Sequence, residues 1–317
     1  MTAGPAINPT DIIARLQKNI ESVVMGKTDS IRLCMVALIA GEHILLEDVP
    51  GVGKTLIGKS LAKSIDADFC RLQFTPDLLP TDIVGSSIFK PKTSEFEFIK
   101  GPIFSNVVLA DEINRAPPRT QSALLEAMSE KQVSVDGHSY PLADPFIVIA
   151  TQNPYEFEGT YNLPESQMDR FLLRISVGYP NPERELEILS SHRNGEPVNQ
   201  LGPVVNNSDI CALHVAARNV HVDDSISKYI LDVVHRTRNS DELRVGVSTR
   251  GALLWYKAAQ SLALMEGKDF VTPDHAKQLA VSVLSHRVSP RRLLSGAQKH
   301  EIEAIMERLV DEVDVPS

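Results

Sequence analysis

The sequence is poor in cysteine, and its cysteines are not arranged for metal binding. Cys34, Cys70 and Cys211 are far apart in the chain, and each lies among apolar residues. Zinc sites usually require ligands in closely spaced pairs. We therefore expect these cysteines to be reduced residues that pack in the interior.

The chain also lacks an excess of positive charge and long apolar runs. Its 32 Lys and Arg residues are outnumbered by 41 Asp and Glu residues, which gives a formal net charge of −9. This balance argues against a surface that grips nucleic acid, so we expect no nucleic-acid partner. The longest apolar runs end before the roughly 18 residues of a membrane-spanning helix, and no basic-plus-apolar signal opens the chain. We expect a cytoplasmic protein without membrane insertion.

The segment from Gly41 to Ser64 has the pattern of a strand, a glycine-bearing turn and a helix. An apolar run at 44–46 suits a strand buried on both faces, and apolar residues recur at helical spacing after the turn. Glycines let backbone N–H groups fold around an anion, and the following helix start adds positive potential. We expect Lys54 to supply a charge for nucleotide phosphates and Thr55 to offer its hydroxyl to Mg²⁺. The residues expected to contact the nucleotide here are Val49, Pro50, Gly51, Val52, Gly53, Lys54, Thr55 and Leu56.

Asp48 departs from the strict phosphate-loop pattern, which has glycine at this position. A Gly-Lys-Thr turn in an unrelated loop is therefore an alternative for these residues taken alone.

Two helices are expected before this segment. Thr10 is the expected N-cap of the first, and the second spans about 28–40. Met25 and Gly26 lie between them and are candidates for an adenine pocket. Simple helix packing is the alternative for the apolar residues before Gly26.

A second apolar run, over 107–110, ends in Asp111 and Glu112. Ligands of open α/β sheets bind at the C-terminal ends of the strands, where these carboxylates would lie. We expect Asp111 to hold Mg²⁺ through water and Glu112 to orient and polarise an attacking water molecule.

A further apolar strand over 146–151 leads to Asn153. Its amide can orient water or a γ-phosphate, and a turn-forming role is the alternative. Two hairpins are also expected, one over 96–104 around a Gly-Pro turn and one over 133–142 with an Asp-Gly turn. Aromatic residues of the first hairpin either touch a partner or pack within the hairpin.

The composition and the apolar pattern of the sequence change near residue 180. The sequence predicts an α/β nucleotide-binding core over 1–180, with helices on both sides of a parallel sheet. Residues 181–207 are rich in Asn, Gly and Pro and are expected to contain a linker. Residues 208–317 are expected to form a smaller all-α domain, with Ser208 or Asp223 as helix caps.

Four motifs carry a family resemblance: GVGKT at 51–55, VVLADE at 107–112, IATQN at 149–153 and MDRF at 168–171. With these motifs in this order, the chain resembles the AAA+ ATPases over about residues 10–290. The sequence DEINRA at 111–116 is similar specifically to the MoxR family, in the helix-2-insert clade. The variant loop start at Asp48 also occurs in that family. The resemblance implies an AAA+ P-loop core with a helical lid, and an ATPase that binds ATP and Mg²⁺.

The resemblance also implies roles for individual residues. Lys54 and Thr55 match the phosphate and Mg²⁺ residues of the family. Asp111 and Glu112 match its Mg²⁺-binding and water-activating pair, and Asn153 matches its first sensor.

Two arginines match family positions that lie outside the phosphate loop. Arg170, in MDRF, resembles the arginine finger that reaches into a neighbouring subunit, and such a guanidinium is worth about 10³ to 10⁵ in rate. Arg250 is similar to the lid-domain sensor arginine, although the family often has proline where this chain has Thr249. Arg287, Arg291 and Arg292 form a basic cluster that we expect on the lid surface or at a contact between subunits.

The resemblance finally implies partners. Members of the family often act as chaperone-like remodelling ATPases on proteins that commonly carry von Willebrand factor A domains. It implies a homo-oligomeric ring, a hexamer, whose two hairpins contact the client. A nucleic-acid motor and an ATP-gated scaffold with little turnover are the alternative functions.

Overall fold

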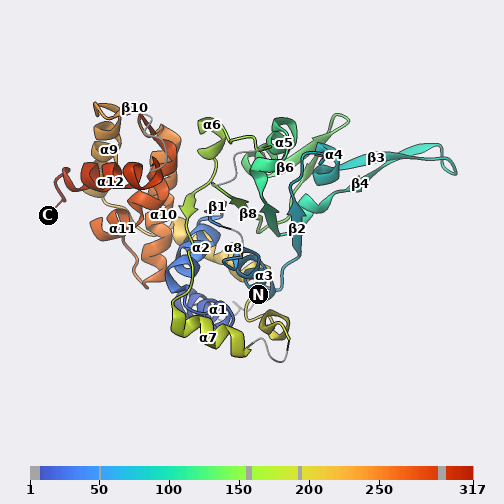
Figure 1. Ribbon diagram of the computed structural model, residues 1–317, viewed down its shortest axis with the longest axis horizontal. Helices are drawn as coiled ribbons and strands as arrows, with labels where there is room; N and C mark the ends of the chain where they lie inside the picture. Colours follow the sequence, from blue (N-terminus) through green and yellow to red (C-terminus); the bar gives the residue numbers. More distant parts are fainter. Residues whose placement is uncertain (1–7, 50, 155–158, 192–194, 292–297, 317) are drawn as a thin grey trace, which may run out of the picture.

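The computed structural model describes residues 8–49, 51–154, 159–191, 195–291 and 298–316. Within this part of the chain, a five-stranded parallel sheet has the strand order β2-β5-β8-β1-β9 (Figure 1). Its strands are β1 (Ile44–Glu47), β2 (Phe69–Gln73), β5 (Val107–Asp111), β8 (Ile147–Gln152) and β9 (Leu173–Ile175). The predicted α/β class with a parallel sheet is confirmed.

Successive residues of the central strands are buried on opposite faces of the sheet. Leu46 and Leu109 belong to one apolar core, whereas Leu45 and Val108 belong to the other. Because both faces are covered, these strands read as continuous apolar runs. The helices of the N-terminal part that contribute to the two cores are α1 (Pro9–Glu21), α2 (Thr28–Ala40), α3 (Lys54–Ser64), α4 (Pro80–Val84) and α5 (Pro118–Glu130).

The register of the strands aligns their carboxyl ends. Glu47 at the end of β1 is paired with Gln152 of β8, and Gln73 of β2 is paired with Asp111 of β5. The segments that follow β1, β5 and β8 therefore begin at the same edge of the sheet. These segments contain the predicted phosphate loop, the predicted acids and Asn153.

The first hairpin differs from its prediction. Its strands are β3 (Gly85–Lys90) and β4 (Glu95–Lys100), so the Gly-Pro pair is not its turn. Gly101 instead closes the base of the hairpin by donating from its N–H to the carbonyl of Val84 at 3.2 Å. Proline has a fixed φ and no N–H, which suits the first position of the short helix η1 (Pro102–Phe104).

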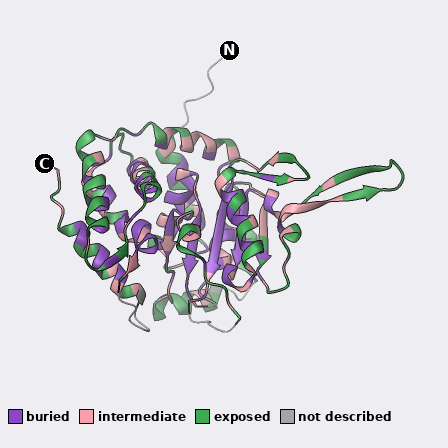
Figure 2. Ribbon diagram, turned by 90° about the horizontal axis from the view of Figure 1, so that it is seen from above, coloured by how far each residue is buried: buried purple, intermediate pink, exposed green. Residues whose placement is uncertain are grey.

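The second hairpin, β6 (Gln132–Val135) and β7 (His138–Pro141), has the predicted Asp-Gly turn. The two hairpins touch: Ser87 Oγ donates to Asp136 Oδ2 at 2.5 Å, and the rings of Phe98 and Tyr140 stack with centroids 4.2 Å apart. The β3–β4 hairpin extends from the body of the protein with mostly exposed residues (Figure 2).

The C-terminal part is mainly helical, as predicted, but it also contains strands. Residues of β10 (Leu243–Val245) and β11 (Ser289–Pro290) pair antiparallel, which corrects the expectation of helices alone. Strands this short offer no alternating pattern in the sequence. The helices of this part and of the segments before it are α6 (Glu165–Met168), α7 (Pro182–Ser191), η4 (Pro197–Gln200), α8 (Asn207–Arg218), α9 (Asp224–Arg238), α10 (Thr249–Met265), α11 (Pro273–Leu284), η5 (Ser285–Arg287) and α12 (Gln298–Asp311).

Two helix caps differ from those predicted. Asn8, not Thr10, caps α1, and Asn206, not Ser208, caps α8. Asp223 caps α9 as expected, with its side chain accepting from the N–H of Ser225. Each observed cap stands directly before the helix, where its side-chain oxygen meets free N–H groups.

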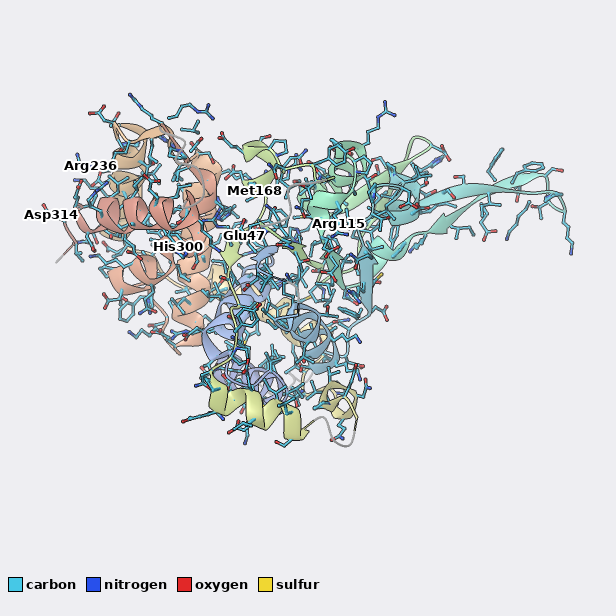
Figure 3. All side chains as sticks on the ribbon, viewed as in Figure 1. Glu47, Arg115, Met168, Arg236, His300 and Asp314 are labelled. Atoms are coloured by element: carbon cyan, nitrogen blue, oxygen red, sulfur yellow. The ribbon has the colours of Figure 1, made fainter. Side chains whose placement is uncertain are left out.

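The helical part packs directly on the core. Helix α10 lies against α2, and Trp255 is fully buried in a core cluster that spans both parts. Glu47 lies at the end of β1 (Figure 3) and forms ion pairs with Arg174 of β9 at 3.6 Å and Lys299 of α12 at 3.3 Å. The lid therefore contacts the strand that leads into the phosphate loop.

Among the described residues, no helix combines the length and the apolar character needed to cross a membrane.

Candidate nucleotide site

The loop between β1 and α3 turns through two glycines in left-handed backbone. Gly51 has φ +86° and Gly53 has φ +95°, and a Cβ on either would meet no atom within 4 Å. The backbone conformation, rather than lack of space, thus requires glycine here. Gly53 directly precedes α3, so the free N–H groups of that helix face the loop. Pro50, a predicted contact residue, lies outside the described residues.

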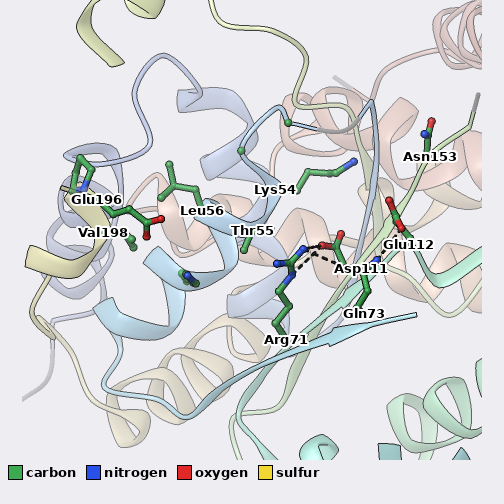
Figure 4. Close-up of a pocket in the computed structure, with 14 residues that line it drawn as sticks. Lys54, Thr55, Leu56, Arg71, Gln73, Asp111, Glu112, Asn153, Glu196 and Val198 are labelled. Atoms are coloured by element: carbon green, nitrogen blue, oxygen red, sulfur yellow. Dashed lines mark hydrogen bonds and ion pairs between the residues drawn. The ribbon is translucent and has the colours of Figure 1, made fainter. Parts of the chain in front are cut away.

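A cavity of about 420 Å³ lies between this loop and the carboxyl edge of the sheet (Figure 4). Residues predicted from separate motifs meet in it, because the strands that carry them are neighbours. Asn153 is among them, with 6% of its surface exposed. The predicted site residues that line this phosphate cavity are Gly51, Gly53, Lys54, Thr55, Leu56, Asp111, Glu112 and Asn153.

The ammonium group of Lys54 is turned back onto its own loop. Its Nζ donates to the carbonyl oxygens of Asp48 at 2.8 Å and Val49 at 3.1 Å. Burial lowers the pKa of Lys54, and the negative charge of Asp111 acts in the opposite direction. Neutral carbonyls are weaker partners than an anion, so the amine is held beside the cavity and is available to a phosphate.

Thr151 of β8 holds both predicted acids. Its hydroxyl donates to Asp111 Oδ1 at 2.6 Å and accepts from the backbone N–H of Glu112 at 2.9 Å. Glu112 has φ +56°, which is uncommon for a residue other than glycine, so the chain turns sharply between the two acids. Thr151 was not among the predicted site residues, although a hydroxyl residue in an apolar run was an available signal.

Two polar residues of β2 face the same acids and were also missed. Arg71 donates to Asp111 Oδ2 from Nε at 3.1 Å and from Nη2 at 2.5 Å (Figure 4). Gln73 Nε2 donates to Glu112 Oε2 at 2.8 Å, and Arg115 pairs with the same oxygen at 3.2 Å. Residues two apart in a strand face the same side, so the order Arg-Leu-Gln was a signal that two polar groups lie together.

A more apolar cavity of about 540 Å³ adjoins the phosphate cavity, and the two share Gly51, Gly53 and Leu56. Its position and apolar lining suit a nucleotide base. Gly26 and Val49 are not among the described lining residues of either cavity. The apolar residues that line this base cavity are Val23, Val24, Met25, Val52, Leu56, Tyr179, Pro180, Ile188 and Leu189.

Asp48 joins the phosphate loop to the segment after β9. Its carboxylate accepts hydrogen bonds from Val49 N at 2.9 Å, Ser176 Oγ at 3.2 Å and Gly178 N at 2.6 Å. Burial alone would raise the pKa of Asp48, but these hydrogen bonds, led by that from Gly178, hold it below its usual value. Lys27 Nζ also donates to the carbonyl of Gly178, at 2.9 Å. Asp48, which stands where the strict pattern has glycine, thus connects the loop by hydrogen bonds to the segment that leads to α7.

The segment after α7, where we expected a linker, contributes to the phosphate cavity. Glu196, Pro197 and Val198 line its wall, and Val198 is 1% exposed. Further along, the N–H of Val204 donates to the carbonyl of Ser64, near the end of α3, at 2.9 Å. The segment therefore packs along α3, a contact that was not predicted.

Arg170 and Arg250 are not among the residues that line the phosphate cavity of their own chain. Arg170 Nη1 donates to the carbonyl of Leu125 at 2.7 Å and to Ser129 Oγ, both on α5. Arg250 is exposed in the first turn of α10. A role for Arg170 in a neighbouring subunit stays a prediction.

Arg287 is buried, which corrects the expectation that it lies on the lid surface. It is 5% exposed, and its Nε pairs with Asp169 Oδ1 at 3.0 Å. Burial lowers the pKa of Arg287 to about 10. The reason is that η5 packs on the MDRF segment, where a carboxylate and several carbonyls need donors. Arg291 is exposed and donates from Nε to the carbonyl of Leu243 at 3.1 Å, and Arg292 lies outside the described residues.

The donor groups in the phosphate cavity fit magnesium. Thr55 and Asp111 supply a hydroxyl and a carboxylate beside Lys54. Mg²⁺ prefers oxygen ligands and is usually bound by one or two carboxylates together with substrate phosphates.

Comparisons with known proteins agree with this geometry. Residues 43–173 match the ATPase family associated with various cellular activities (AAA), and residues 235–309 match the AAA lid domain. The chain is 41% identical to the chaperone MoxR1 of Mycobacterium tuberculosis, over 94% of this chain and 80% of that protein. It is 50% identical to protein YeaC of Bacillus subtilis, over 96% and 95%. A solved structure from Cytophaga hutchinsonii has a TM-score of 0.87 at 38% identity, covering 98% and 96%.

The match to the AAA ATPases covers the strands that carry the predicted acids, and the lid match covers most of the C-terminal helices. The identity with MoxR1 extends over both parts. The chain therefore belongs to the MoxR family of AAA ATPases, enzymes with a P-loop that hydrolyse nucleoside triphosphates.

Proposed function

We propose that this ATPase forms a hexameric ring and couples Mg²⁺-dependent ATP hydrolysis to the remodelling or maturation of partner proteins in the cytoplasm. One observation carries the catalytic part of the proposal. The residues predicted to bind phosphate, metal and water line one cavity, and an apolar cavity of suitable size for a base adjoins it. The relative named chaperone MoxR1 supports a chaperone-like role.

Five residues of the phosphate cavity have catalytic or binding roles in this proposal. Lys54 leaves its loop carbonyls and binds the β- and γ-phosphates, for which it is a compact point charge. Glu112 accepts the proton of the attacking water, and Asn153 orients that water or the γ-phosphate. Thr55 and Asp111 would hold magnesium, which would supply positive charge to neutralise the charge that develops on the phosphates.

The two arginines outside the cavity complete the site in the assembled ring. Arg170 reaches the cavity of the next subunit, and Arg250 senses the nucleotide from the lid. An isolated subunit would then hydrolyse ATP slowly, because the guanidinium that stabilises the transition state comes from a neighbour.

The proposed motion divides the chain into three parts. Residues 1–180 form the nucleotide-binding core, residues 181–207 form the connecting region, and residues 208–317 form the lid. Hydrolysis moves the lid against the core. The ion pair of Lys299 with Glu47 supports this coupling, because it joins the lid to the strand before the phosphate loop.

The two hairpins are the proposed contact with the client. A cavity of about 1000 Å³ lies between them. Phe96 and Ile88 of the projecting hairpin are 74% and 53% exposed, and exposed apolar groups of this kind mark interaction surfaces. We propose a protein client, with a von Willebrand factor A domain as the first candidate.

The catalytic proposal is tested by measuring ATP binding and Mg²⁺-dependent hydrolysis in two variants. Lys54→Ala should lose both, and Glu112→Gln should retain binding but lose hydrolysis. Lys63→Ala removes the same charge from the last turn of α3 and should behave as wild type. Absence of Mg²⁺-dependent hydrolysis in the wild type at every protein concentration would refute the proposal.

The shared-site proposal needs mixed rings. Subunits with Glu112→Gln and subunits with Arg170→Ala should each be inactive alone. Mixed, they should regain partial activity, because some interfaces then combine an intact Glu112 with an intact Arg170. Mixtures with no more activity than the sum of the separate proteins would contradict the trans role.

The client is sought with the Glu112→Gln protein held with ATP, using Lys54→Ala as the control that does not bind nucleotide. A protein retained only by the ATP-bound form is the expected result. Stimulation of hydrolysis by DNA, with a steep dependence on salt, would instead indicate a nucleic-acid motor.

A further inference from the structure

Arg71 of β2 binds the carboxylate that the proposed function assigns to magnesium. We propose that Arg71 is a positioning residue that holds Asp111 until a nucleotide arrives and then transfers its guanidinium to the phosphates. The inference rests on the proposed function, because it requires Asp111 to serve the metal. Arg71 has no counterpart in the motifs of the sequence analysis and is identified by its contacts alone.

The contacts of Asp111 leave neither carboxylate oxygen without a hydrogen bond. Oδ1 accepts from Thr151 Oγ1 at 2.6 Å. Oδ2 accepts from Arg71 twice, from Nε at 3.1 Å and from Nη2 at 2.5 Å. The bond from Thr151 comes from a buried neutral hydroxyl, so it is compatible with a cation near the other oxygen. The bonds from Arg71 place a positive charge on the side of Asp111 that faces the cavity (Figure 4).

A magnesium ion at this side of Asp111, or a water molecule through which Asp111 would hold it, would therefore compete with Arg71 for Oδ2. Mg²⁺ demands near-ideal octahedral geometry and keeps several of its waters, which leaves no room for a guanidinium bound at the same position. Two cations at one oxygen also repel each other at close range. Arg71 has to release Oδ2 before Asp111 serves the metal.

The side chain of Arg71 is half-exposed, whereas that of Asp111 is mostly buried. The exposed fraction of Arg71 is 49%, compared with 11% for Asp111, so the arginine reaches solvent while the acid is fixed. An ion pair with one half-exposed partner contributes little to stability, so its release costs little. The other described contact of the guanidinium is a long bond of 3.3 Å to Gln73 Oε1.

The nucleotide phosphates are the acceptor that replaces Asp111. Arg71 lines the same cavity as Lys54 and Thr55. A guanidinium has a planar fork of donors that matches phosphate oxygens, so the exchange replaces one bidentate anion by another. Arg71 thus stabilises bound nucleotide most when magnesium is absent, and it opposes magnesium while it remains on Asp111.

This dual role predicts a change in the coupling between magnesium and nucleotide. The measurement is the Kd of a fluorescent ATP analogue in excess Mg²⁺ and in excess EDTA, which needs no catalysis. The quantity compared is the ratio of the Kd in EDTA to the Kd in Mg²⁺. In Arg71→Ala this ratio should rise roughly tenfold, with most of the change in the EDTA value, because a charge-assisted contact to phosphate is lost and a competitor of the metal is removed.

Two further variants keep the test decisive. Arg71→Gln retains length and hydrogen-bonding capacity without charge and should shift the ratio in the same direction, should the alanine variant fold poorly. Arg236→Ala removes an exposed arginine that is paired with Glu312 on the lid, and it should leave the ratio unchanged. Thermal melting without nucleotide confirms that each variant is folded.

The outcomes separate this inference from the function on which it rests. An unchanged ratio would overturn the inference, whether the Kd values in Mg²⁺ and EDTA both rise equally or both stay as in the wild type. If the wild type bound the ATP analogue neither in excess Mg²⁺ nor in excess EDTA, the proposed function itself would be overturned.

Discussion

The backbone N–H of Gly178 donates a hydrogen bond of 2.6 Å to Oδ2 of Asp48. Asp48 begins the phosphate loop, and Gly178 precedes Tyr179 and Pro180, which line the base cavity. The predicted phosphate loop is therefore tied to the wall of the apolar cavity that is the candidate site for the base. Glycine at position 48 would have no side chain to make this connection.

Asp48→Asn should weaken nucleotide binding about tenfold and lower the free energy of unfolding by about 2 kcal/mol. The two carboxylate oxygens accept from different N–H groups, Oδ1 from Val49 and Oδ2 from Gly178. An amide has only one acceptor oxygen, so one of these N–H groups would face another donor. Chemical denaturation and titration of a fluorescent nucleotide measure the two effects.

Ser176→Ala is the matched control for Asp48. It removes only the hydroxyl that donates to Oδ2 at 3.2 Å, so its effect on both measurements should be smaller. Equal effects of the two substitutions would show that the backbone contacts of Asp48 do not matter.

His43→Gln should reduce the loss of stability between pH 7 and pH 5 by about 2 kcal/mol. Nε2 of His43 lies 3.0 Å from the carbonyl of Met128, and Nδ1 accepts from the N–H of Val148 at 3.0 Å, so the folded protein needs the neutral ring. Burial lowers the pKa of His43 from 6.5 to about 4. The unfolded chain therefore binds a proton that the folded protein excludes, and stability is lost as the pH falls from 6.5 towards 4. Urea denaturation across this range gives the slope for both proteins, and identical slopes would contradict the assignment.

Arg287→Met should lower the free energy of unfolding by about 3–5 kcal/mol, because it leaves the carboxylate of Asp169 and nearby carbonyls without their donor in a buried position. Arg308→Met is the control, since its ion pair with Glu242 is half-exposed and should contribute less than about 1 kcal/mol. Thermal or chemical denaturation measures both. Similar losses in the two variants would mean that burial of Arg287 adds nothing.

Gly101→Ala should distort the base of the β3–β4 hairpin and cost about 1–3 kcal/mol. Its φ of −83° suits any residue, but a Cβ would lie 2.3 Å from the carbonyl oxygen of Ile83 and 2.5 Å from the N of Gly85. Gly202→Ala is the matched control, because no atom lies within 4 Å of its Cβ position. Limited proteolysis of the hairpin should be faster only in the Gly101 variant. Unchanged proteolysis and stability would show that the backbone adjusts freely.

Much of the nucleotide site was predictable from short segments. Gly51, Gly53 and Lys54 are close together in the chain, so their backbone freedom and charge indicated a candidate phosphate site without reference to distant residues. The acids follow an apolar run, and the carboxyl ends of parallel strands share one edge of the sheet, so Asp111 and the phosphate loop were expected to meet. The helical stripes were likewise visible as periodic apolar positions.

The hairpin and the basic cluster were not predictable in the same way. The alternation of apolar and polar residues on both sides of Gly101 suggested a turn there. The strand over 95–100 instead pairs with residues 85–90, which lie before the predicted hairpin of 96–104. Arg287 was predicted to lie on the surface because its partner, Asp169, is far from it in the chain. No residue close to Arg287 in the sequence indicates that the two pair.

The phosphate loop, the two acids after a buried strand and the helical C-terminal part were predictable from the residues alone, because each of these features depends on residues that are close in the chain. The tertiary structure decided which side chains hold the acids. Strand β2 lies beside β5, and β8 lies on its other side, so Arg71 and Thr151 meet Asp111 from opposite neighbours. Strand order results from packing across the whole domain. The alternation of residues in a strand predicts which face of the sheet a side chain occupies, but it does not predict which strand lies beside it.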